Sequence, residues 1–251
     1  MTATRVDMHV KILDERVAER AKRHGIDVLV YAPHFTRWET IRNRAERFSD
    51  DDLLVVPARE LFTGNWQNRR HVLALGLQRG IPDFLTLDGA MNELAKQDAV
   101  VCVPHPGFLT ISLEREHVRE YRDLVDTMEV YNPKHLPWDN RRARRLAAEF
   151  DVPGFTSSYA HLPKTIGECW TTFERDIQCA EDLHEALREG IPRTPQHRNG
   201  LGHLTRRVVE FAHIGYENTW KKFDRVYLSG TEPTHPDHIA YGGAFEESSV
   251  Y

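Results

Sequence analysis

The sequence predicts an α/β protein built around a barrel of mostly parallel strands. Short apolar runs of strand type alternate with helical segments at intervals of about 25 to 30 residues. Such alternation indicates βαβ units with right-handed crossovers and a parallel sheet. A chain of 251 residues is also long enough to bury the core of a full barrel.

The expected elements follow one another in a regular order. The first strand spans residues 5–11, where apolar Val6, Met8 and Val10 alternate with polar side chains. Further strands are expected at residues 25–31, 53–57, 71–75, 99–103, 127–131 and 152–156, with one more short strand at 170–173. Helices are expected at residues 14–24, 38–48, 86–96, 116–124, 140–150 and 180–189.

The character of the sequence changes near residue 190. We expect residues 1–190 to form the barrel domain and residues 191–251 to form a C-terminal helical segment and tail that packs on the barrel. From Thr194 onward the chain is polar, rich in histidine and helix-forming, and from Ser229 it carries Gly, Pro and Ser without clear periodicity.

Composition excludes several classes of protein. The net charge of -5 gives no overall attraction to nucleic acid or to an anionic membrane, although local basic clusters leave nucleic acid open as a partner. The three cysteines form no CxxC pair, which argues against a disulfide framework or a thiolate metal site. Neither a signal peptide nor a membrane-spanning apolar run is evident, so we expect a cytoplasmic protein, and the oligomeric state is left open.

Histidine is the unusual feature of the composition, with 14 residues. In barrels of parallel strands the catalytic groups lie at the C-terminal strand ends. The polar residues at or near such ends are His9, His34, Glu60, His105, Glu129 and His161. His71 begins its apolar run instead, which fits an antiparallel strand or a bulged entry. Imidazoles and a carboxylate that converge from several strands can hold divalent metal ions, so the sequence predicts a metal centre.

A series of short motifs resembles the polymerase and histidinol phosphatase (PHP) superfamily over residues 5 to about 190. The motifs are Asp7-x-His9, Pro33-His34, Glu60, His71, Val103-Pro104-His105-Pro106 and Ser158-Tyr159-Ala160-His161. The resemblance implies a distorted seven-stranded (β/α) barrel with a C-terminal helical extension, and metal-dependent hydrolysis of phosphate esters.

The resemblance also implies roles for individual residues. Glu60, His71 and His105 match the group that holds one metal, with Glu60 as the bridging carboxylate. His34 and His161 match ligands of another metal, for which Asp14 is a candidate third ligand. His9 matches a ligand of the remaining site.

The sequence departs from the family pattern at Lys11, Pro33 and Tyr159. Lys11 stands where the family has a histidine, and Tyr159 and Pro33 stand where it has aspartates. The net charge of a divalent ion paired with an aspartate equals the net charge of a lysine paired with a neutral tyrosine. We therefore hypothesise that the Lys11 ammonium replaces one ion and leaves two, of zinc, manganese or iron. Lys11 and Arg37 are candidates to stabilise phosphoryl charge, and Tyr159 is a candidate hydrogen-bond donor to substrate.

These observations favour a metal-dependent phosphoesterase that acts on a small phosphorylated substrate, a phosphomonoester or a nucleotide-type ester. One alternative is a catalytically degenerate barrel that binds RNA or a protein, in which Lys11 and Tyr159 mark the lost activity. Another is a hydrolase of C–N bonds, a class that usually carries an aspartate at the last strand, where this chain has Tyr159.

Overall fold

A nine-stranded sheet forms the centre of the chain, with the strand order β7-β6-β5-β4-β3-β2-β1-β8-β9. The structure is a computed structural model, and it describes residues 3–65, 67–107, 111–216 and 233–250. Residues 217–232 and 251 of the expected C-terminal segment lie outside this described part. The strands are β1 Thr4–Val10, β2 Val28–Tyr31, β3 Leu54–Thr63, β4 Arg70–Leu75, β5 Val100–Val103, β6 Thr127–Tyr131, β7 Gly154–Thr156, β8 Cys169–Phe173 and β9 Arg193–His197.

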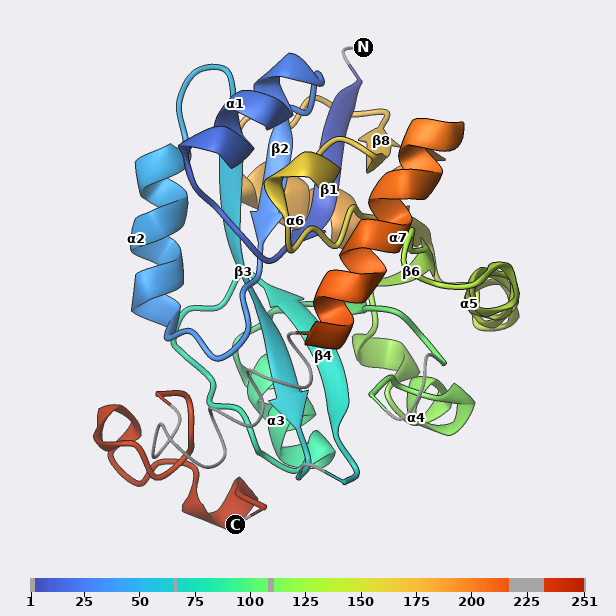
Figure 1. Cartoon of the computed structure of the whole chain (residues 1–251). Coiled ribbons are helices and arrows are strands. Elements are labelled where there is room, and N and C mark those ends of the chain that lie inside the picture. The colour runs from blue at the N-terminus through green and yellow to red at the C-terminus, as the bar shows by residue number, and fades with distance from the viewer. Residues whose placement is uncertain (1–2, 66, 108–110, 217–232, 251) are drawn as a thin grey trace.

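The sheet curls into a nearly closed barrel (Figure 1), which confirms the predicted α/β barrel. The curl brings β7, at one end of the strand order, against β8, the second strand from the other end. There the Thr171 hydroxyl hydrogen bonds with both the backbone N–H and the carbonyl of Thr156. Strands β1 to β7 are the seven expected strands, and β8 is the expected additional one. Strand β9, which pairs with β8, was not predicted. The division of the chain at residue 190 stays a prediction.

One strand runs against its neighbours. Strands β1, β2 and β3 are parallel, and so are β5, β6 and β7, but β4 is antiparallel to both β3 and β5. An antiparallel strand starts at the end of the barrel where its parallel neighbours stop. His71, the second residue of β4, therefore lies at the same end as the histidines that follow parallel strands.

Helices pack against the sheet. Most of their ends lie within one residue of the expected ones, but the helix expected at 116–124 ends at Glu120 and the helix expected at 140–150 begins at Pro137. The helices are α1 Glu15–Arg23, α2 Trp38–Phe48, α3 Leu87–Lys96, α4 Arg115–Glu120, α5 Pro137–Glu149, α6 Ala180–Arg188 and α7 Leu201–Tyr216. Helix α1 begins at Asp14, whose side chain accepts a hydrogen bond from the backbone of Val17. None of the helices in the described ranges has the length and apolarity needed to cross a membrane.

Two apolar clusters hold the barrel together. One lies between the sheet and helices α1, α2 and α3, and it includes Val17, Ile41 and Leu94. The other joins inward-facing residues of the strands, such as Val6 and Met8, to α6. The alternation expected in the first strand holds for Val6 and Met8 but fails at Val10, which belongs to the first cluster because the register shifts between Asp7 and Val10. Asp7 and His9 are buried as well, because both faces of the strand are covered.

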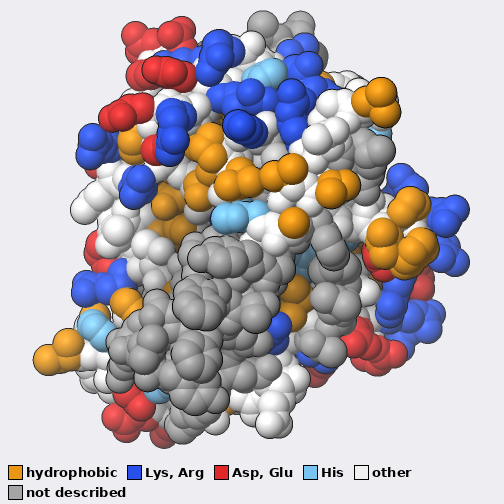
Figure 2. Space-filling view, in the orientation of Figure 1, with side chains coloured by type: hydrophobic (Ala, Val, Ile, Leu, Met, Phe, Trp, Pro, Cys, Tyr) orange, Lys and Arg blue, Asp and Glu red, His pale blue; other side chains and the backbone are white. Residues whose placement is uncertain are grey.

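The surface charge is uneven although the net charge is small. Figure 2 shows Lys and Arg side chains gathered over the upper part of one face, near α1. Arg20 lies close enough to Arg23, Arg198 and Arg206 for its charge to interact with each of theirs. We refer to these four residues as the arginine cluster.

Candidate metal centre

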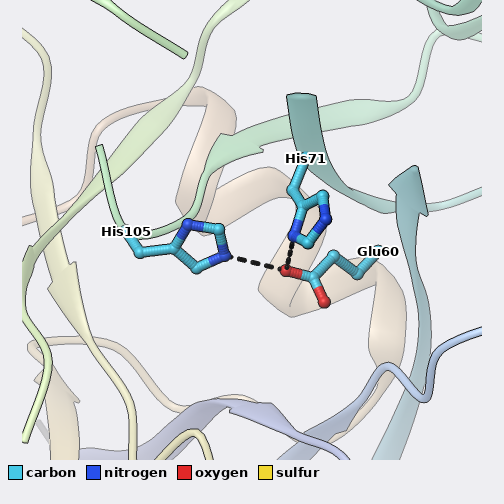
Figure 3. Close-up of side chains that lie close together, drawn as sticks. All are labelled: Glu60, His71 and His105. Atoms are coloured by element: carbon cyan, nitrogen blue, oxygen red, sulfur yellow. Dashed lines mark hydrogen bonds and ion pairs between the residues drawn. The ribbon is translucent and has the colours of Figure 1, made fainter. Parts of the chain in front are cut away.

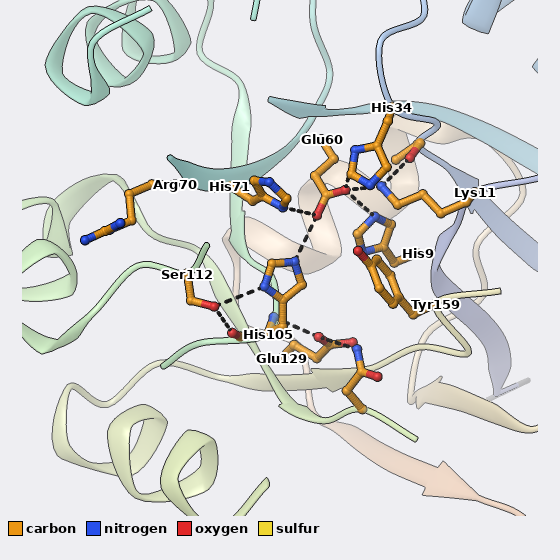
Figure 4. A network of polar contacts seen from close by, with 12 residues as sticks. His9, Lys11, His34, Glu60, Arg70, His71, His105, Ser112, Glu129 and Tyr159 are labelled. Carbon is orange, nitrogen blue, oxygen red and sulfur yellow. Dashed lines mark hydrogen bonds and ion pairs between the residues drawn. The ribbon is translucent and has the colours of Figure 1, made fainter. Parts of the chain in front are cut away.

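A single carboxylate, Glu60 of β3, lies at the centre of the polar end of the barrel. Its side chain is completely buried, and its two oxygens face different partners (Figure 4). Oε1 faces His71 and His105, whereas Oε2 faces His9, Lys11 and His34. Burial alone would raise the pKa of Glu60, but the charge of the Lys11 ammonium is the largest opposing influence and that pKa lies well below its usual range. Glu60 is therefore ionised and has the two-sided position of a bridging ligand.

Glu60, His71 and His105 form a group that can hold a metal ion (Figure 3). Their ligand atoms lie within 4.8 Å of one another. Glu60 Oε1 is 3.2 Å from His71 Nδ1 and 3.0 Å from His105 Nε2. Ligands at about 2.0 Å from a tetrahedral zinc ion lie about 3.3 Å apart, so these separations fit one ion.

Unused nitrogen atoms support the same fit. His71 is buried, and neither of its ring nitrogens forms a hydrogen bond within the described residues. Buried polar atoms normally have a partner, because leaving one unsatisfied costs about 1 to 3 kcal/mol. A metal ion would satisfy one of these nitrogens, so the donor set fits a divalent cation in charge and in geometry.

His9 and His34 lie on the other side of Glu60. His9 Nε2 is 3.6 Å from Oε2, and His34 Nδ1 is 3.2 Å from the same oxygen. Burial, together with the nearby Lys11 charge, lowers the pKa of His9 to about 3 and that of His34 well below its usual value. Both imidazoles are therefore neutral near pH 7, which is the form that binds metals.

Lys11 points into the cluster rather than to solvent. Its ammonium contacts Glu60 Oε2 and donates a 2.7 Å hydrogen bond to the carbonyl of Ala32, at the end of β2. Burial lowers the pKa of Lys11 to about 8, against the opposing effect of Glu60, so the ammonium form prevails near neutral pH.

His105 is positioned by three contacts with two residues, Glu129 and Ser112. Its backbone has a positive φ of 35°, a conformation that residues other than glycine rarely adopt. The backbone N–H of His105 donates to Glu129 (2.8 Å), its carbonyl accepts from the Ser112 hydroxyl, and its Nδ1 lies 3.1 Å from that hydroxyl. Glu129, in the middle of β6, therefore orients His105 without facing Glu60. These contacts direct the Nε2 atom of His105 toward the carboxylate.

Tyr159 and His161 enter the cluster from the loop after β7. The Tyr159 ring packs edge-on against His9, with centroids 4.8 Å apart. The His161 ring lies 6.5 Å from that of His34. Lys134 joins this loop to the one after β6, because its ammonium contacts the Tyr159 carbonyl and lies 2.8 Å from His161 Nδ1. Lys134 belongs to none of the motifs in the sequence, so it was not predicted as a site residue.

Two other residues named from the sequence lie apart from this cluster. Arg37 precedes α2, and its half-exposed guanidinium lies 3.8 Å from Glu39. Asp14 caps α1 and bonds Arg16, so the structure does not bring it to His34 and His161. All the predicted metal residues, together with Lys11 and Tyr159, are brought together at one end of the barrel. Their roles as ligands and catalysts stay proposals.

Fold and side chains define a class: an α/β barrel with a buried centre of histidines around one carboxylate. Residues 137–191 match the sequence model of a family described as PHP-associated. The match and the barrel together confirm the resemblance to the PHP superfamily.

One curated protein is a partial relative of this chain. An uncharacterized protein of Methanocaldococcus jannaschii, MJ0417, is 29% identical over 135 residues, which make up 51% of this chain and 55% of that protein. The chain thus spans about half the length of this relative.

Two solved structures share the fold. PsfC from Pseudomonas syringae PB-5123 has a TM-score of 0.65 at 19% identity, and the alignment covers 87% of this chain and 100% of PsfC. The lesion-specific endonuclease PfuEndoQ from Pyrococcus furiosus has a TM-score of 0.58 at 14% identity, over 77% of this chain and 58% of that one. At these identities the similarity concerns the fold.

Proposed function

We propose that this chain is a PHP-type metal-dependent phosphoesterase. The observation that carries the proposal is the convergence of Glu60, His71 and His105 on one point inside the barrel. The PHP-associated match supports it, because the resemblance to the PHP superfamily implies metal-dependent hydrolysis of phosphate esters. A phosphomonoester or a nucleotide-type ester is the proposed substrate.

In this proposal Glu60, His71 and His105 hold a divalent ion of zinc, manganese or iron. Such an ion, when bound, supplies Lewis-acid polarisation of a phosphoryl oxygen and activation of water. The Lys11 ammonium presents positive charge to the phosphoryl group in a buried setting, where electrostatic interactions are stronger than in water. Tyr159, beside His9, provides a phenol that can donate a hydrogen bond to the substrate.

Hydrolysis of p-nitrophenyl phosphate in the presence of manganese or zinc tests the function. We expect the wild-type chain to hydrolyse it and His71→Ala to lose at least about 100-fold in kcat/KM, because that change removes a metal ligand. His184→Ala is the matched control, since His184 lies on α6 outside the cluster, and it should retain the wild-type rate. Equal rates for His71→Ala and the wild type, or no hydrolysis with any of these metals, would contradict the proposal.

A second candidate function is nucleic-acid binding without catalysis, and the arginine cluster favours it. Arg20, Arg23, Arg198 and Arg206 concentrate positive charge on a chain that is acidic overall, and PfuEndoQ, which shares the fold, is named a lesion-specific endonuclease. Phosphate binding of this kind weakens steeply with salt. Salt-dependent binding of single-stranded RNA by a chain that hydrolyses no phosphoester would favour this candidate.

A further inference from the structure

The polar end of the barrel contains two buried lysines beside the histidines. A metal site of several ions would place these lysines next to further positive charges. Where the family pattern has a histidine and an aspartate, this chain has Lys11 and Tyr159. The positions of the ammonium groups therefore bear on how many ions the centre holds.

Lys11 occupies the Oε2 side of Glu60. Its side chain is 3% exposed, and its ammonium contacts Oε2 and the carbonyl of Ala32. An ion bound by Oε2 with His9 and His34 would lie beside this ammonium, and the two positive charges would repel each other strongly in a buried site.

Lys134 has the corresponding position beside His161. Its ammonium lies 2.8 Å from His161 Nδ1 and 4.3 Å from the centre of the Tyr159 ring. His161 Nδ1 also lies 3.0 Å from the Tyr159 carbonyl, so this atom already has partners within the loop. An ion bound by His161 would lie beside the Lys134 ammonium, and the two positive charges would repel each other.

Only the Oε1 side of Glu60 lacks a lysine contact among the described residues. It faces His71 and His105, and this trio is the one His, Cys, Asp and Glu group in the described part of the chain whose ligand atoms converge. We propose that the centre holds a single divalent ion, bound by Glu60, His71 and His105, and that the ammonium groups of Lys11 and Lys134 stand in place of further ions. This inference lowers the predicted count from two to one and rests on the proposed function only for the presence of an ion.

Metal content tests the inference without reference to activity. The full chain is dialysed to equilibrium against manganese or zinc, and the bound metal is measured by elemental mass spectrometry. We expect one ion per wild-type chain. His71→Ala should lose the ion, whereas His34→Ala should keep it, because His34 faces Oε2 and Lys11.

Replacing Lys11 tests directly whether its ammonium stands in place of an ion. Lys11→His removes the ammonium and adds a ligand beside Glu60, so it should bind two ions. Lys164→His is the matched control, because Lys164 is exposed and lies outside the cluster, and it should bind one. Circular dichroism shows which variants are folded. If Lys11→His does not fold, the metal content of His34→Ala compared with that of His71→Ala still decides on which side of Glu60 the ion is bound.

The outcomes separate the inference from the function. Two or more ions in the wild type, or loss of the ion in His34→Ala, would overturn the single-ion inference. A folded Lys11→His that binds only one ion would overturn the place assigned to Lys11. No bound metal would overturn both the inference and the proposed function. One ion in a chain that hydrolyses no phosphoester would leave the inference standing and overturn the function.

Discussion

At the scale of single residues, Asp7 gives the fold a dependence on pH. Its side chain is fully buried and accepts a hydrogen bond from the Ser158 backbone, while its Oδ2 forms none within the described residues. Burial raises the pKa of Asp7 from 3.8 to about 7. The folded chain therefore binds this proton more tightly than the unfolded chain. Its contribution to the free energy of unfolding falls as pH rises from about 4 to about 7, and the loss is complete above that range.

The substitution Asp7→Asn should reduce this dependence. Between pH 5 and pH 8.5 we expect the free energy of unfolding of the wild type to fall by about 2 kcal/mol more than that of Asp7→Asn, because the amide does not ionise. Urea unfolding at both pH values measures the difference. Asp51→Asn, which changes an exposed aspartate, should behave like the wild type. If Asp7→Asn kept the full pH dependence, another group would have to carry it.

The same scale shows which parts of the site the sequence can predict. Glu60, His34 and His105 are predictable because each ends or follows an apolar run, and strand ends meet at one end of a barrel. Lys134 was missed because it lies in a loop with no periodicity. Its place beside Tyr159 depends on how the loops after β6 and β7 fold against each other.

At the scale of elements, Asp14 has a structural role as the N-cap of α1. Its carboxylate accepts a 2.9 Å hydrogen bond from the Val17 backbone, whereas the resemblance made it a candidate metal ligand. Asp14→Ala should lower the free energy of unfolding by about 1 kcal/mol, as expected for loss of a helix cap, with metal content unchanged. Asp14→Ser retains a capping oxygen and should recover most of the stability. Loss of bound metal in both variants would instead support the ligand role.

Strand direction explains where sequence prediction of the elements fails. Each helix and parallel strand leaves a local period that the sequence shows, so α2 was predicted from its first residue to its last. The reversal of β4 leaves no such signal, apart from the position of His71 at its start. Strand β9 is short, mostly exposed and contains Pro195, so neither apolar alternation nor burial indicates it. Its pairing with β8 at the edge of the sheet determines it.

At the scale of the whole molecule, the barrel closes where β7 meets β8. Thr171 is fully buried there, and its hydroxyl accepts from the Thr156 N–H (2.9 Å) and donates to the Thr156 carbonyl (3.0 Å). One side chain thus replaces a pair of backbone hydrogen bonds at the closure. Lys11 also donates its backbone N–H to the Ala160 carbonyl, which ties β1 to the loop after β7. The candidate metal residues on β1 and on that loop depend on this closure for their relative positions.

The substitution Thr171→Val should therefore loosen the closure while keeping the shape of the side chain. It leaves the buried N–H and carbonyl of Thr156 unsatisfied, so we expect the free energy of unfolding to fall by about 2 to 4 kcal/mol. The neighbouring Thr172→Val is the matched control, because the Thr172 hydroxyl is buried without a hydrogen bond in the described structure and its loss should change stability by less than about 0.5 kcal/mol. Urea unfolding compares the two variants. Equal stability would mean that the Thr171 hydroxyl does not hold the barrel closed, whereas a loss confined to Thr171→Val, together with weaker metal binding, would link closure of the sheet to the geometry of the centre.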